Sequence, residues 1–275
     1  MLKTEKSTLK NKLLDLVKCI PITAPTPAKV VIDGGWLLHK IPWIRNTAVV
    51  EILQQYVLFI RNKFQSDCTI IFDGYGEENI KDHEHRRRRS DKICCDVHLR
   101  PDSINKFDQT KFLANETNKM QLVNLLSSRL QQDGHLVLVS RGDADTMIAS
   151  QALHLAKEDD IDVICSDTDV LCLLVQHTVW KTENHRGKIF FRKEPQSGRP
   201  HTGGRFSIDD ISDALHPQQA KSLLLLHAWT GADTTSALFH HGKLGLFHEI
   251  TKSENLARIT REISKEEKLR KKLVP

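Results

Sequence analysis

The candidates for chemistry in this 275-residue chain are seven aspartates, each placed after an apolar stretch or at the start of a helical one. They are Asp33, Asp73, Asp143, Asp145, Asp167, Asp169 and Asp233. Carboxylates gathered in one crevice repel one another, so such a cluster is stable mainly when divalent cations neutralise it. Ligands that are all oxygen favour Mg²⁺ or Mn²⁺ over zinc. Two such ions, about 3.5 to 4 Å apart, can activate a water and stabilise both oxygens of a phosphodiester displacement. The acids therefore predict a two-metal site for phosphate chemistry.

Short strands are expected to position these acids. Runs rich in Val, Ile and Leu, which are typical of buried parallel strands, lie in KVVID, CTIIFD, HLVLVS and IDVICSD. Segments with apolar residues at helical spacing lie between them, at 47–64, 117–131 and 144–157. Alternation of strand and helix predicts an α/β fold with a mostly parallel sheet. Ligands of such sheets bind outside the carboxyl ends of the strands, so the acids would converge there.

The spacing of the acids adds to this argument. One aspartate after a strand is weak evidence, because aspartate is also common in turns and at helix N-caps. Asp143 and Asp145 are two residues apart, and so are Asp167 and Asp169. On an irregular turn that enters a helix, two acids at this spacing can both point inward and share a bridging ligand. Two such pairs and three further acids together are a strong indication of a metal site.

A basic segment follows Asp73. Lys81 and Arg88 are seven residues apart, or about two helical turns, so both would point the same way from a helix. With Arg86, Arg87 and Arg89 they would form a clamp for a phosphate held by metals on its other side. The alternative is that the arginine run is a solvated helix face or a localisation signal. The neighbouring histidines and the CCDVH sequence lack the spacing of a zinc site.

The ends of the chain differ from its centre. A helix with Leu9, Leu13, Leu16 and Val17 on one face is expected near the start, more often a packing or partner helix than a membrane one. A proline-rich linker at 21–29 follows it. Beyond residue 175 we expect an antiparallel hairpin formed by TVWKT and KIFFRK, then short helices over 207–251 and a charged, solvated helix to the end.

Composition narrows the class of protein. The net charge is +5, with 39% hydrophobic and 27% charged residues, as in ordinary globular proteins that can bind a polyanion. The six cysteines form no disulfide framework, and we see neither an export signal nor a membrane span. We therefore expect an intracellular protein, nuclear or cytoplasmic, that acts as a monomer, has no membrane partner, and has protein partners that the sequence does not identify.

The acidic motifs resemble those of a known family. VVIDGG, IIFDG, GDAD, SDTDVL and TGADTTS are similar to the successive motifs of flap endonucleases and XPG-type structure-specific 5′ nucleases, over residues 29 to about 250. The resemblance implies a PIN-like three-layer sandwich with a C-terminal element like a helix-turn-helix. It implies a nuclease domain over 29–206, with an arch or cap at 90–130, between an N-terminal extension (1–28) and a helical C-terminal extension (207–275).

The resemblance also implies roles for individual residues. One metal would be surrounded by Asp33, Asp73, Asp143 and Asp145, and the second by Asp145, Asp167, Asp169 and Asp233. Lys81 and Arg88 would grip the scissile phosphate and count as catalytic together with Asp145, which both metals share. The segment ALFHHGKLGLFHEI resembles the element that holds duplex DNA, with Gly242, Lys243 and Gly245 in its turn.

The expected function is therefore a Mg²⁺- or Mn²⁺-dependent endonuclease that cuts branched or 5′-flap DNA, as in DNA repair. Two alternatives stay open. The fold could serve as a nucleic-acid or protein binding module without catalysis, or as an RNA-cleaving nuclease of the related PIN class. Asp143 and Asp145 stand where the family usually has glutamates, and this shorter reach is the main departure from its pattern.

Overall fold

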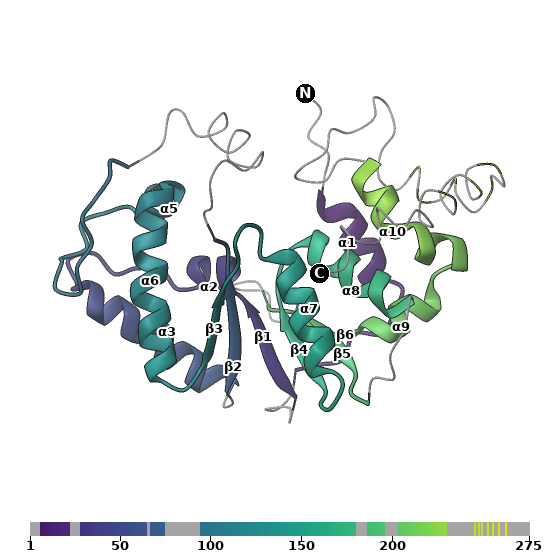
Figure 1. Cartoon of the computed structure of the whole chain (residues 1–275), viewed down its shortest axis with the longest axis horizontal. Helices are drawn as coiled ribbons and strands as arrows, with labels where there is room; N and C mark the ends of the chain where they lie inside the picture. The colour runs from purple at the N-terminus through teal and green to yellow at the C-terminus, as the bar shows by residue number, and fades with distance from the viewer. Residues whose placement is uncertain are drawn as a thin grey trace. The chain divides into compact units, whose positions relative to one another are not determined.

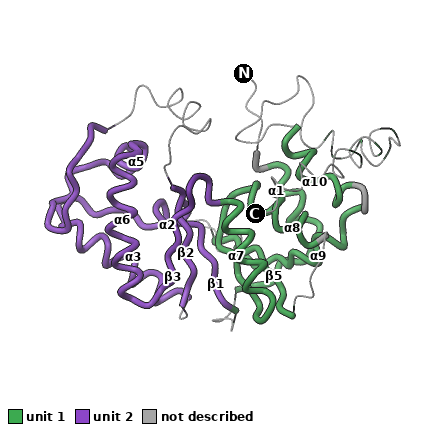
Figure 2. Tube along the Cα trace, in the orientation of Figure 1, with its two compact units in different colours: residues 1–28, 145–275 green, residues 29–144 purple. Residues whose placement is uncertain are grey.

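The computed structural model describes residues 6–22, 28–64, 67–74, 94–179, 186–195 and 203–229, together with single residues between 245 and 262. The chain divides into two compact units, which Figure 2 shows in different colours. One unit comprises residues 29–144. The other comprises residues 1–28 and 145–275. Each unit carries its own strands and helices, and the acids of interest are distributed over both.

Parallel strands form the centre of the 29–144 unit. They are β1 (Lys29–Asp33), β2 (Cys68–Phe72) and β3 (Leu136–Val139), in the order β3-β2-β1. Val30 pairs with Cys68, and Ile70 pairs with Val137. Every residue of β2 is buried, which explains why its sequence is an unbroken apolar run. As expected from the sequence, β1 and β2 therefore each lead to an aspartate at their carboxyl end.

The helices of this unit are α2 (Gly34–Lys40), α3 (Val49–Phe64), α5 (Gln109–Ala114) and α6 (Glu116–Gln132). Figure 1 shows α3 beside α6, and α6 packs on β3. The apolar residues that recur at helical spacing along α3, including Ile52, Tyr56 and Ile60, are buried. The Tyr56 hydroxyl donates to the Leu38 carbonyl at 2.8 Å and accepts from Trp43 Nε1 at 3.0 Å, which ties α3 to the end of α2.

A segment without regular secondary structure, residues 94–99, is bound to α6 by amide side chains. Asn115 Nδ2 donates to the Cys94 carbonyl and Asn118 Nδ2 to the Cys95 carbonyl, both at 2.9 Å. Asn118 Oδ1 and Gln121 Oε1 accept the backbone N–H groups of Val97 and Leu99, at 2.8 and 2.9 Å. These three side chains, at positions 115, 118 and 121, form the amide ladder of α6. The CCDVH sequence is therefore part of a segment that these hydrogen bonds hold in place.

The second unit combines α1 (Lys6–Leu14), α7 (Asp145–Leu155), α8 (Thr168–Val179), α9 (Ile208–Ala214) and α10 (Pro217–Trp229) with β4 (Ile161–Ile164), β5 (Ile189–Lys193) and β6 (Gly204–Ser207). β4 and β5 are parallel, whereas β5 and β6 are antiparallel. The α/β fold class predicted from the sequence is confirmed, with three parallel pairings described and one antiparallel pairing.

The predicted hairpin between TVWKT and KIFFRK is wrong. Thr178 and Val179 complete α8, residues 180–182 lie outside the described residues, and β5 pairs with β4 and β6 instead. The Thr178 hydroxyl donates to the Leu174 carbonyl at 3.0 Å, one helical turn earlier. The β-branched residues of TVWKT suggested a strand, but burial of the apolar run from Val170 to Val175 keeps this part of the chain helical.

The N-terminal helix is a packing helix. Leu9, Leu13 and Leu14 are buried, and α1 packs against α8 of the same unit. The helix ends at Leu14, so the predicted stripe does not extend to Leu16 and Val17, which lie in the following turn. Among the helices described, none has the length and apolar character needed to cross a membrane. The six cysteines, all of which are described, are free thiols.

Candidate active site

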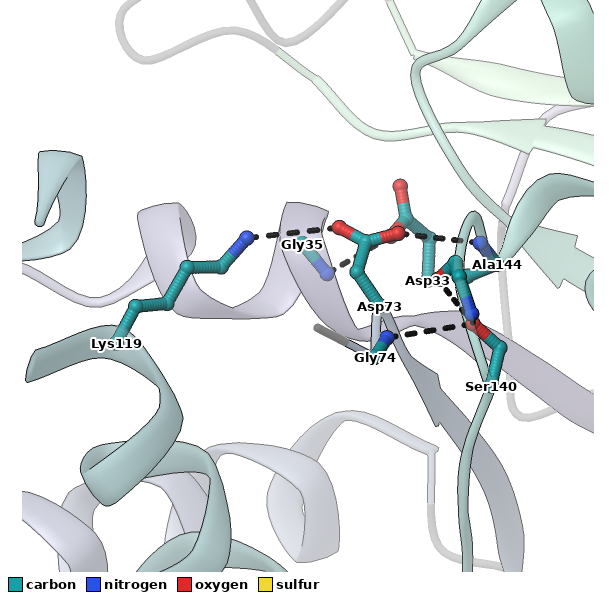
Figure 3. Close-up of polar contacts among 8 residues, drawn as sticks. Asp33, Gly35, Asp73, Gly74, Lys119, Ser140 and Ala144 are labelled. Atoms are coloured by element: carbon teal, nitrogen blue, oxygen red, sulfur yellow. Dashed lines mark hydrogen bonds and ion pairs between the residues drawn. The ribbon is translucent and has the colours of Figure 1, made fainter. Parts of the chain in front are cut away.

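Asp33 and Asp73 lie at the carboxyl ends of neighbouring parallel strands, and Figure 3 shows their side chains close together. Asp33 ends β1 and is the N-cap of α2, where its Oδ1 accepts the Gly35 N–H at 2.8 Å. Asp73 follows β2, and its Oδ1 accepts the Ala144 N–H at 3.1 Å. The Lys119 ammonium of α6 lies 3.5 Å from Asp73 Oδ2. Strand register and two backbone donors therefore set the positions of both carboxylates.

Gly35 marks the space that the two carboxylates share. A Cβ at this position would lie 3.1 Å from Asp33 Oδ1 and 4.0 Å from Asp73 Oδ2, so oxygens of both acids border the same point. Figure 3 shows Gly35 beside these acids. Glycine at this position lets the Gly35 backbone approach both carboxylates closely, because it carries no side chain.

The loop after β3 is tied to the end of β2. The Gly74 N–H donates to the Gly142 carbonyl at 2.9 Å and to the Ser140 hydroxyl at 3.3 Å. A Cβ on Gly74 would lie 1.6 Å from the Ser140 carbonyl oxygen, so only glycine fits this close approach. The same loop carries Asp143, whose side chain is exposed, and ends at Ala144. Asp145 is the first residue of α7 and is assigned to the other unit.

Asp167 and Asp169 lie in the second unit, where β4 leads into α8. Asp167 Oδ1 accepts the Asp169 N–H at 3.1 Å, and the Asp167 N–H points to Cys165 Sγ at 3.2 Å. His227 of α10 lies beside this loop, with its Nε2 2.7 Å from Asp169 Oδ1. Side chains from outside the acidic motif therefore help to hold these acids.

Lys10 of α1 also reaches the loop. Its ammonium donates to the Ser166 carbonyl. Burial lowers the pKa of Lys10, and the negative charge of Asp167 acts in the opposite direction. The N-terminal helix thus brings a cation next to the acidic motif SDTD, a contact that its amphipathic pattern alone did not predict.

The donors in both units suit Mg²⁺ or Mn²⁺ because they are carboxylate oxygens. Within the part of the chain that the structure describes, no group of three or more His, Cys, Asp or Glu side chains is arranged as a ready-made metal cage. Mg²⁺ commonly binds through one or two carboxylates and completes its shell with waters and substrate phosphates. The pair Asp33 and Asp73, whose oxygens lie near a common point over Gly35, fits that manner of binding.

Comparison with known proteins agrees with the architecture. No protein-family model matches the chain, and neither does any curated protein sequence. Solved structures do match. The catalytic core of Rad2 in complex with DNA substrate superposes with a TM-score of 0.53 and 14% identity, over 90% of this chain and 67% of that one. A second complex of the Rad2 core gives 0.52 and 14% identity, over 97% and 77%. The bacteriophage T5 D15 protein co-crystallised with metal ions gives 0.46 and 15% identity, over 86% and 85%.

The chain has a flap endonuclease/XPG-like PIN nuclease fold. This confirms the fold that the motifs suggested. In this PIN-like fold, Asp33 and Asp73 stand at strand ends as predicted, and Asp167 and Asp169 follow β4 as predicted. Their assignment to particular metals stays a prediction.

Several predicted site residues of this PIN-like chain lie outside the described residues. They are Asp233, Lys81, Arg86, Arg87, Arg88, Arg89, Gly242 and Lys243. The described part of the predicted arch is the segment bound by the amide ladder, followed by α5 and most of α6. Gly245, predicted to lie in a turn, has helical backbone and is exposed. Nearby, the buried Phe247 accepts a hydrogen bond from Gln219 Nε2 at 2.7 Å, which ties it to α10.

Sequence reasoning missed Lys119, His227 and Lys10. None of them belongs to an acidic motif, and each reaches its partner across a large sequence separation, 46 residues for Lys119 and Asp73 and 58 for His227 and Asp169. The one signal available was the placement of His227 and Lys119 within amphipathic helices, where a lone polar residue has many explanations. The packing of α6, α10 and α1 brings these three side chains to their partners.

Proposed function

We propose that this chain is a divalent-metal-dependent endonuclease that hydrolyses phosphodiester bonds in DNA, with a preference for flap or branched structures. The observation that carries the proposal is the pair of carboxylates at the ends of β1 and β2, whose oxygens lie 3.1 and 4.0 Å from a Cβ position on Gly35. The nuclease fold supports it, and the Rad2 core of the same fold is known in complex with DNA substrate.

In this proposal Asp33 and Asp73 hold one cation, and Asp167 and Asp169 hold a second. Asp143 would join the first cation, Asp233 would join the second, and Asp145 would be shared by both, as the family resemblance implies. When bound, the metals supply an activated water and stabilise the charge that develops on the phosphate. The protein groups orient the carboxylates: the Gly35 and Ala144 amides do so for the first pair, and the Asp169 amide does so for Asp167.

Basic residues would then hold the substrate. Lys119 already places an ammonium beside Asp73, and the proposed clamp of Lys81 and Arg88 follows Asp73 in sequence. A phosphate between metal ions and ammonium or guanidinium groups has its negative charge stabilised from both sides. Because backbone phosphates carry no sequence information, the proposed enzyme would select the structure of its substrate rather than a base sequence.

A nuclease assay with matched variants tests this proposal. The substrates are flap, bubble, nicked and single-stranded forms of DNA and RNA, with and without Mn²⁺. We expect metal-dependent cleavage of a DNA flap, which Asp73→Ala and Asp167→Ala each abolish. Asp102→Ala and Asp213→Ala, exposed acids of the two units, serve as controls and should cut like the wild type. Cleavage of every substrate by the Asp73 and Asp167 variants at the wild-type rate would refute the site, and preference for RNA flaps would assign the enzyme to RNA.

A binding module without catalysis is the second candidate. One observation favours it: the Lys119 ammonium supplies a positive charge to Asp73 without any metal. Calorimetry with millimolar Mg²⁺ and Mn²⁺ separates the two proposals. Intact affinity for nucleic acid without metal binding would support the module and contradict the nuclease.

A further inference from the structure

His227 and Asp169 form a largely buried polar contact at the acidic loop of the second unit. The imidazole Nε2 lies 2.7 Å from Asp169 Oδ1, and 5% of the histidine side chain and 17% of the aspartate side chain are exposed. An ionised carboxylate can only accept, so Nε2 carries the hydrogen of this bond. The contact joins α10 to the start of α8, two elements separated by 58 residues in the sequence.

The position of His227 is set by the packing of α10 against α8. Gln176 of α8 reaches α10 twice: its Oε1 accepts the Leu224 N–H at 3.5 Å, and its Nε2 donates to the Lys221 carbonyl at 3.4 Å. Leu223 and Leu226, on the same helix as His227, are buried. The histidine therefore projects from a helix that is fixed by both apolar packing and hydrogen bonds.

A carboxylate has two oxygens, and a cation at this loop needs one of them in a defined direction. A hydrogen bond from His227 to Oδ1 restricts rotation of the Asp169 carboxylate and so fixes the direction of its oxygens. Carboxylates that bind metals are commonly held in this way by outer hydrogen-bond partners, whose replacement lowers metal affinity. The carboxylate of Asp167 is held as well, because its Oδ1 accepts the Asp169 N–H at 3.1 Å.

We propose that His227 is a positioning residue, whose Nε2–H orients the Asp169 carboxylate for a divalent cation. This inference rests on the proposed function in one respect, that Asp169 binds a metal. It goes beyond that function in naming a residue of α10 that touches neither the metal nor the substrate.

Mn²⁺ binding without nucleic acid tests the inference. The measurement is a titration followed by electron paramagnetic resonance, and the relevant site is the one that Asp169→Asn weakens. His227→Leu should weaken Mn²⁺ at that site by roughly 10- to 100-fold. His227→Gln should keep most of the affinity, because its Nε2 stands the same number of bonds from Cβ and donates in the same place. His177→Leu, which replaces a half-buried histidine of α8, is the matched control and should bind Mn²⁺ like the wild type.

A double-mutant cycle separates positioning from a general loss of structure. In the Asp169→Asn background, His227→Leu should change Mn²⁺ affinity little further, because the two residues act through one carboxylate. If the leucine variant does not fold, His227→Asn replaces it, since its amide is too short to reach Asp169 and the same loss is expected.

Melting temperatures with and without Mn²⁺ give an independent measure. A positioning role predicts that His227→Leu removes most of the Mn²⁺-induced rise, whereas a purely structural role lowers both melting temperatures equally. Unchanged Mn²⁺ affinity in His227→Leu, equal loss in His227→Gln, or no Mn²⁺ binding by the wild type would each overturn the inference. The proposed function fails separately: a protein that binds Mn²⁺ as described but cuts no substrate refutes the nuclease and leaves the positioning role standing.

Discussion

Asp33 and Asp73 of the 29–144 unit accept hydrogen bonds from backbone amides, whereas Asp169 and Asp162 of the other unit are held by side chains of distant residues. Asp33 accepts from the Gly35 N–H and Asp73 from the Ala144 N–H. In the other unit, Asp169 is held by His227, and the buried Asp162 of β4 by Arg192 and Arg205. Backbone donors depend on the path of the chain and tolerate many side-chain changes. Side-chain donors depend on particular residues, so the two units should respond differently to substitution.

The largest effect is expected at Asp162, which is fully buried. Its oxygens lie 2.6 Å from Arg205 Nη2 and 3.5 Å from Arg192 Nη1. Asp162→Ala would leave two largely buried guanidinium groups without this partner, at a cost of about 3–5 kcal/mol in the free energy of unfolding. Asp73→Asn, which keeps an oxygen for the Ala144 N–H, should cost under about 1 kcal/mol. Urea denaturation of both variants measures the difference, and equal stability would contradict the contrast between the units.

The second effect tests the backbone side of the comparison. In Gly74→Ala the new Cβ would lie 1.6 Å from the Ser140 carbonyl oxygen, so the backbone would have to move. We expect a loss of about 1–3 kcal/mol or more in the free energy of unfolding. Gly245→Ala is the matched control, because nothing lies within 4 Å of its Cβ and alanine favours a helix by up to about 1 kcal/mol. Wild-type stability of Gly74→Ala would show that the loop after β3 is free to rearrange.

A third effect concerns the charge at each pair of acids. Lys119 brings a cation to Asp73 and so competes with a metal, whereas the hydrogen bond from His227 prepares Asp169 for one. Lys119→Met should therefore tighten Mn²⁺ binding, by about 2- to 5-fold, as expected for a partly exposed ion pair. Lys119→Met and His227→Leu should thus change the affinity for Mn²⁺ in opposite directions. Mn²⁺ titrations of Lys119→Met, with the exposed Lys106→Met as control, check the sign, and weaker binding would show that Lys119 orients Asp73 instead.

The smallest effect is expected at an ion pair that belongs to neither set of acids. The Arg61 guanidinium donates from Nε to Asp133 Oδ2 at 2.8 Å and holds the pKa of Asp133 below its ordinary value. A lowered carboxyl pKa stabilises the folded state at neutral pH, and this contribution disappears as the pH falls below about 4. Arg61→Gln should thus reduce stability slightly at pH 7 and by less at pH 3. Thermal melts at both pH values check this, and a change in Mn²⁺ affinity would contradict the separation from the site.

The sequence predicted the features that depend on local pattern. The strands that end at Asp33 and Asp73 are unbroken apolar runs, so their carboxyl ends, and the acids there, followed directly from the pattern. The hairpin at TVWKT failed because tertiary burial of α8 outweighed strand propensity. In IDVICSDTD, no local signal separates the buried, arginine-paired Asp162 from the acids of the loop. That distinction comes from β5 and β6, which lie more than twenty residues further along the chain.

The amide ladder of α6 has a consequence for the dynamics of the chain. Val97 donates its N–H to Asn118 and accepts at its carbonyl from Gln121, at 2.8 and 2.7 Å, and Leu99 donates to Gln121 at 2.9 Å. The side-chain amides thus bind alternate residues as the edge of a neighbouring strand would. In hydrogen–deuterium exchange, Val97 and Leu99 should be protected although they belong to no strand, and their protection should rise and fall with that of α6. A helix can in this way give an irregular segment the exchange behaviour of a sheet.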